Sequence, residues 1–117
     1  MPHVVLNGNI KIEDIFAKLK PLFVREGENI LKTGSVYIDR KKSAILIDSL
    51  VIERGKKTSF FSTISGREDG VVVRIYPVLE VEKTNGVKKL IAEIAKQLMQ
   101  IFPEFKLGPT NLIEFLP

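Results

Sequence analysis

Residues 33–82, TGSVYIDRKKSAILIDSLVIERGKKTSFFSTISGREDGVVVRIYPVLEVE, decide the fold that we predict for this chain. The end of this stretch, residues 71–76, has a period of two, which places successive side chains on opposite faces of a β-strand. One face carries Val71, Val73 and Ile75, and the other carries Val72, Arg74 and Tyr76. The first face is typical of a core. The second is more apolar and aromatic than a face that only meets water.

The rest of this stretch repeats the strand pattern. Short segments rich in charge or glycine interrupt it at residues 39–42, 54–57 and 66–70, and connections of this length are typical of hairpins. Residues 43–53 contain two apolar runs, 44–47 and 50–52, separated by Asp48 and Ser49. Runs that are apolar at both parities indicate a strand that is at least partly covered on both faces. We therefore predict a four-stranded antiparallel meander over residues 33–82.

Two amphipathic helices are predicted to flank the meander. Over residues 12–23 the apolar positions recur at spacings of three and four, but Pro21 removes a backbone donor, so we expect a kink or an end near Lys20. Residues 25–32 are then expected to form a loop that leads into the sheet. Over residues 85–102 an apolar stripe predicts the second helix, with Thr84 or Asn85 as its cap and Pro103 just beyond its end.

The two chain ends add further strand signals. Residues 3–6 are β-like and run into Asn7-Gly8, which indicates either a hairpin with residues 9–12 or a break before the first helix. Near the carboxyl terminus, residues 111–116 are apolar enough that we expect them to add an edge strand or to dock on a neighbouring subunit.

These elements predict a single α+β domain over residues 1–117. In it, a strand or hairpin at the amino terminus extends the meander, and both helices pack on one face. The order of elements resembles one repeat of the TATA-box-binding protein fold and is similar to profilin-like and longin-like arrangements. The resemblance concerns the order alone, and because one fold serves many functions it assigns no role to any residue.

Composition narrows the class of protein. The 117 residues include no cysteine, which excludes disulfides and thiolate metal sites, and a single histidine. The apolar runs are far shorter than the roughly 18 residues of a membrane span. The amino terminus has no secretory pattern, so we expect a cytoplasmic protein without membrane association. The net charge of +4 favours acidic partners, nucleic acid among them.

The sequence offers little for catalysis. His3 lies at the amino terminus, and residues 66–70 have the wrong spacing for a phosphate-binding loop. Asp48, Glu68 and Asp69 are acidic residues of turns and bends, which are usually solvated. We therefore expect no catalytic residue, metal or cofactor. A cleft in which one of these carboxylates meets Tyr76 or a lysine would instead indicate an enzyme.

A basic cluster is predicted at one end of the sheet. Alternate turns of a meander share an end, so the second turn should lie near the end of the last strand and the start of the second helix. Cations and helix N–H groups that converge can hold an anion or nucleic acid, although turn lysines more commonly keep a surface soluble. The residues concerned are Arg54, Lys56, Lys57, Lys83, Lys88 and Lys89.

The mixed sheet face is the second candidate surface. Apolar residues rimmed by charge indicate contact with another surface. Depending on register, this face also takes some of Ile45, Leu46, Phe60 and Phe61. We expect a non-enzymatic protein that forms a homodimer or higher homo-oligomer, or binds a partner, through this face; a basic nucleic-acid-binding module is the alternative. No sequence feature selects a small-molecule ligand. The predicted interface residues are Val72, Arg74, Tyr76, Val78 and Phe60.

Overall fold

The stretch predicted as a meander forms consecutive antiparallel strands in the computed structural model, which describes residues 1–77 and 80–116. Asp39 shapes the first turn, because its carboxylate accepts hydrogen bonds from the backbone N–H groups of Ser43 (2.7 Å) and Ala44 (3.1 Å). Arg54 and Gly55 close the second turn with φ angles of 51° and 82°, as a two-residue hairpin turn requires. The strands are β3 (Asn29–Ile38), β4 (Ala44–Glu53), β5 (Lys56–Arg67) and β6 (Gly70–Ile75).

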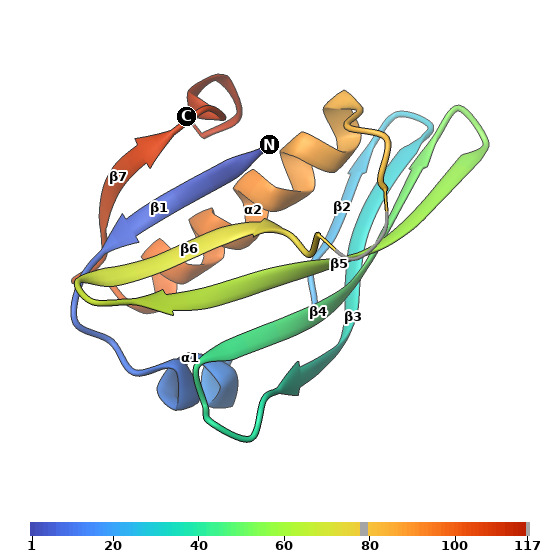
Figure 1. The fold of residues 1–117 in the computed structure, drawn as a ribbon. Helices are drawn as coiled ribbons and strands as arrows, with labels where there is room; N and C mark the ends of the chain where they lie inside the picture. Colours follow the sequence, from blue (N-terminus) through green and yellow to red (C-terminus); the bar gives the residue numbers. More distant parts are fainter. Residues whose placement is uncertain (78–79, 117) are drawn as a thin grey trace.

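Within the described residues the sheet is larger than predicted, with seven antiparallel strands in the order β2-β3-β4-β5-β6-β1-β7. In Figure 1 it curls, with α2 behind β1 and β6. The prediction of a loop over residues 25–32 is wrong. Strand β2 (Phe23–Glu26) forms a hairpin with β3, and Gly27, at a φ of 59°, makes the tight turn between them. Val24 lies opposite Leu31 in this hairpin and packs against the core.

At the amino terminus, the structure follows the second of the two alternatives. Residues 9–12 are not a strand. Instead β1 (His3–Asn7) pairs with β6, where Val4 lies opposite Val73 and Leu6 opposite Val71. All four of these side chains are buried, so contacts with a distant strand, rather than the Asn7-Gly8 dipeptide, decide the partner of β1.

The first helix does not extend to residue 23 but ends close to Lys20, where a kink or an end was expected. Helix α1 (Ile12–Lys18) ends before Pro21, and Leu19 has an extended backbone. A proline disfavours helical geometry in the residue before it, here Lys20, so the helix does not continue through this position. Phe23, predicted on the apolar side of this helix, is instead a strand residue that is 64% exposed.

The second helix agrees with the prediction. Helix α2 (Asn85–Ile101) begins after Thr84, whose hydroxyl accepts a hydrogen bond from the N–H of Val87 at 3.2 Å. Ile94 is 1% exposed at its centre. The core side chains of α1, α2 and the sheet belong to one cluster, so both helices cover the same face of the sheet.

An edge strand is present near the carboxyl terminus, but earlier than predicted. Strand β7 (Lys106–Thr110) pairs with β1. Of the two alternatives for residues 111–116, the edge strand is wrong, because Ile113–Phe115 forms a short 3-10 helix. Docking on a neighbouring subunit stays a prediction. Leu112, 1% exposed, anchors this end in the core.

Candidate functional site

The face of the sheet opposite the helices carries the candidate site, and we call it the outer face. The register aligns one row of its residues across β3, β4, β5 and β6. From β6 to β3, this row is Arg74, Thr63, Leu46 and Tyr37. In the neighbouring row Phe61 lies opposite Asp48, and the N–H of Tyr76 bonds to the carbonyl of Phe61 at 2.7 Å.

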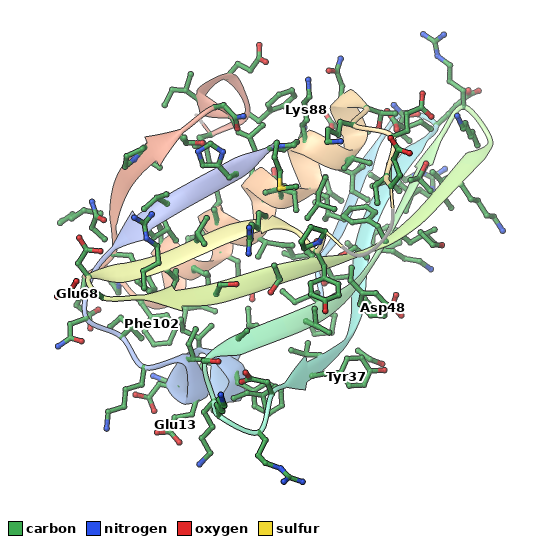
Figure 2. All side chains as sticks on the ribbon, in the orientation of Figure 1. Glu13, Tyr37, Asp48, Glu68, Lys88 and Phe102 are labelled. Atoms are coloured by element: carbon green, nitrogen blue, oxygen red, sulfur yellow. The ribbon has the colours of Figure 1, made fainter. Side chains whose placement is uncertain are left out.

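Aromatic side chains stand out from this face. Phe23, Tyr37, Phe61 and Tyr76 are 64%, 54%, 41% and 37% exposed. Their strand parity is opposite to that of the buried core residues, so they share the outer face. Figure 2 shows Tyr37 and Asp48 projecting from the same part of the sheet. Large aromatic groups gathered on one face indicate a surface that meets a partner.

The predicted interface residues have different outcomes. Val72 and Arg74 lie on the outer face and are half-buried, and Tyr76 is exposed. Phe60 lies opposite Ser49 on the core side and is only 5% exposed, so its side chain does not share the outer face, although Phe60 is among the residues that line the hollow described below. Val78 falls outside the described residues.

The outer face is hollowed, and we call the hollow the outer groove. Its main part has a volume of about 460 Å³ and is mostly apolar, with Leu46, Phe61, Tyr76 and Val81 in its walls. A second part of about 290 Å³ shares Leu46 and Tyr76 with the first and includes Arg74 and Tyr37. A third hollow of about 380 Å³ adjoins the first at Asp48 and Ser59.

Arg74 is the cationic end of the outer groove. Its Nε atom is buried and has no hydrogen-bond partner within residues 1–77 and 80–116. Asp39 lines the same hollow, but its carboxylate already accepts hydrogen bonds from Ser43 and Ala44 in its own turn. These bonds, led by the one from the Ser43 hydroxyl, hold the pKa of Asp39 below its ordinary value.

The opposite end of the outer groove is acidic. Asp48, Glu80 and Glu82 line it. Glu82 forms an ion pair with Lys56 at 2.6 Å, which raises the pKa of Lys56. Asp48 forms no ion pair within the described part of the chain. The groove therefore has charges of opposite sign at its ends and apolar side chains between them.

The predicted basic cluster carries its own counter-charges. Lys56 pairs with Glu82, and Lys89 pairs with Glu26 of β2. The first turn of α2, where an anion was expected, is occupied by the Glu53 carboxylate. That carboxylate accepts a hydrogen bond from the Gly86 N–H at 3.0 Å and one from the Thr84 hydroxyl at 2.5 Å.

The remaining members of the basic cluster take different positions. Arg54 and Lys57 are exposed at the β4–β5 hairpin, Lys83 is exposed before α2, and Lys88 is half-buried on α2. Intrinsic carboxylates therefore neutralise much of the charge that hairpin geometry gathers at this end of the sheet.

For catalysis, the carboxylates singled out from the sequence separate into two groups. Asp48 and Tyr76 line the same hollow, the arrangement expected of an active site, whereas Glu68 and Asp69 lie in the β5–β6 turn. Figure 2 shows Glu68 well away from Asp48. His3 bonds through its ring to the carbonyl of Met1. Within the described ranges, no three carboxylate or histidine side chains gather as a metal site would require.

Sequence reasoning missed Phe23 and Tyr37, two of the four aromatics that are exposed on the described outer face. Phe23 was placed in a helix, and Tyr37 could not be assigned to a face because the register shifts between Thr33 and Val36. Its Val-Tyr-Ile alternation was the available signal.

In the part of the chain that the structure describes, no helix has the length and apolarity to cross a membrane.

Comparison with known proteins adds no assignment. No protein-family model, curated protein or solved structure matches this chain significantly. A function must therefore be argued from the outer face itself.

Proposed function

We propose that this protein works by association, and that its outer face binds a second copy of the same chain. The observation that carries this proposal is the gathering of Tyr37, Phe61 and Tyr76 around the outer groove, each more than a third exposed. Aromatic side chains dominate the energetics of interfaces, because each can remove a large apolar area from water.

The charges of the outer groove favour a second copy over a partner of one sign. A purely cationic partner would meet Arg74, and a purely anionic partner would meet Asp48 and Glu80. A surface with both signs on either side of an apolar centre can complement itself. Two-fold dimers, in which the same surface meets itself, are also the commonest soluble assemblies.

The test is the mass in solution, measured by sedimentation velocity over a wide range of concentration. We expect twice the 13.2 kDa of one chain. Replacing Phe61 with serine should shift the protein toward the monomer, because it removes apolar area at the centre of the surface. The matched control is Phe16→Ser, since Phe16 is 36% exposed on α1, whereas Phe61 is 41% exposed. A monomer at every concentration would refute the proposal.

A second candidate is a single-stranded nucleic-acid-binding module. The observation that favours it is the position of Arg74 in one hollow with Tyr37 and Tyr76. Aromatic rings that stack on bases and cations that contact phosphates are the usual elements of such surfaces.

This candidate has a separate test. Anisotropy of a labelled single-stranded oligonucleotide should rise on binding, and the affinity should fall steeply with salt because counterions are released. Replacing Tyr37 with serine should weaken binding, whereas Phe16→Ser should not. No binding at low salt would remove this candidate and leave the self-association test unaffected.

A further inference from the structure

Four residues of the outer face form a quadrilateral around β5. Arg74 and Leu46 lie on either side of Thr63, and Tyr76 and Asp48 lie on either side of Phe61. Thr63 and Phe61 are two residues apart on one strand. Arg74 and Asp48 are therefore at the ends of one diagonal, and Leu46 and Tyr76 are at the ends of the other. One diagonal is charged, and the other is apolar and aromatic.

Among the residues that the structure describes, neither end of the charged diagonal has an ion-pair partner. The buried Nε of Arg74 has no acceptor within the described ranges, and no ion pair there includes Asp48. Of the other carboxylates that line these hollows, Asp39 serves its own turn and Glu82 binds Lys56. Glu80 is exposed in the segment after β6 and is not part of the quadrilateral. Arg74 as a whole is only half-buried, so its guanidinium can still meet a carboxylate from outside, and charge-assisted hydrogen bonds of this kind are strong.

We infer that Arg74 of each copy binds Asp48 of a second copy across a two-fold axis. The inference rests on the proposed self-association and specifies how the two faces meet. Two stacked faces can be related by an axis that lies in the interface. If this axis runs along the apolar diagonal, Arg74 of the first copy lies over Asp48 of the second. By symmetry, Asp48 of the first copy also lies under Arg74 of the second, so the charge pair forms twice.

The same axis places the apolar groups in suitable positions. Leu46 and Tyr76 lie along it, so each packs close to its own counterpart in the other copy. Stacked sheets lie about 10 Å apart, a gap that an arginine and an aspartate reaching from opposite sides can bridge. Because the axis is inclined to β5, the strands of the two sheets cross steeply, as in orthogonal sheet packings.

Charge reversal tests this pairing. Arg74→Glu and Asp48→Arg each turn both cross-contacts into like-charge pairs, so each should weaken the dimer about tenfold or more in sedimentation equilibrium. The double variant again joins opposite charges and should return to within about threefold of the wild-type affinity. The matched controls are Arg67→Glu and Glu68→Arg, which make the same charge changes at the exposed β5–β6 turn and should leave the affinity unchanged.

A gentler cycle covers the case in which a reversal prevents folding. The affinities of Arg74→Gln, Asp48→Asn and their double variant should be strongly non-additive if the two side chains meet, with thermal melts confirming that each variant is folded. Additive losses, or a double reversal as weak as the product of the singles, would overturn the pairing while wild-type dimerisation still stands. A monomeric wild type would overturn the proposed function as well.

Discussion

The carboxylate of Glu53, the last residue of β4, accepts a hydrogen bond from the backbone N–H of Gly86 in the first turn of α2. The same carboxylate accepts from the hydroxyl of Thr84, which in turn accepts from the N–H of Val87. Glu53 thus supplies negative charge where the helix dipole is positive and ties the sheet to the helix.

Replacing Glu53 with alanine should lower the free energy of unfolding by about 1–2 kcal/mol, the usual cost of losing a helix cap with its charge interaction. Urea denaturation of the two proteins measures the difference. Glu28→Ala is the control, since Glu28 is exposed in the β2–β3 turn and should change stability little. If the two substitutions lowered the free energy of unfolding equally, Glu53 would not stabilise the start of α2.

The close approach at Gly86 predicts a second effect at the same junction. A Cβ on residue 86 would lie 2.6 Å from Cδ of Glu53 and 2.7 Å from Cγ1 of the buried Val51. Gly86→Ala should therefore push α2 away from β4 and destabilise the fold by about 1–3 kcal/mol, even though alanine is the better helix former. A melting temperature equal to or above that of the wild type would contradict this prediction.

Gly70 is restricted by the backbone of β1. A Cβ at this position would lie 2.0 Å from the carbonyl oxygen of Leu6, and a backbone atom cannot rotate away. Gly70→Ala should separate β1 from β6 and cost about 3 kcal/mol or more in chemical denaturation. Gly34→Ala is the control, because the nearest atom to its added Cβ would be 3.7 Å away, an ordinary contact. Similar stabilities for the two variants would count against the β1–β6 register.

The elements that could be predicted are those whose pattern lies within their own segment of the sequence. The stripe of α2 and the alternation of β6 are complete within their own segments, so their structures follow from spacing alone. The partners of β1 and β7 could not be predicted in this way, because they are set by burial against strands far along the chain. Likewise, Glu53 contacts a helix more than thirty residues away, which no local pattern indicates.

The candidate surface was predicted in outline but not in detail. The mixed character of Val72, Arg74 and Tyr76 identified the outer face, yet the choice between Phe60 and Phe61 depended on the register of β5. Two adjacent phenylalanines leave that register undecided, because a shift of one residue exchanges the two faces. The pairing of Phe60 with Ser49 settles it in favour of Phe61.

Ile94 tests whether the α2 stripe holds the domain together. It is 1% exposed at the centre of the helix, so Ile94→Asp would bury a charge without a partner. We expect a loss of more than about 4 kcal/mol and no cooperative thermal transition. Gln100→Asp, on the exposed side of the same helix, should cost less than about 1 kcal/mol. A cooperative melt for Ile94→Asp would mean that the stripe is not core.

Asp39 should make part of the stability depend on acidity. Hydrogen bonds from Ser43 and Ala44 lower its pKa from the ordinary value of 3.8, so the folded protein favours the ionised carboxylate. A depressed pKa gives a stabilising contribution that is complete above the unfolded value and is lost as the pH falls through the folded one. The difference in melting temperature between the wild type and Asp39→Ala should therefore be largest near neutral pH and shrink below pH 3.8. Because this carboxylate is exposed, we expect the difference in melting temperature to be small. Added salt should reduce it little, since the hydrogen-bond donors are neutral. A difference that grows toward low pH would contradict the assignment of these hydrogen bonds to the ionised form.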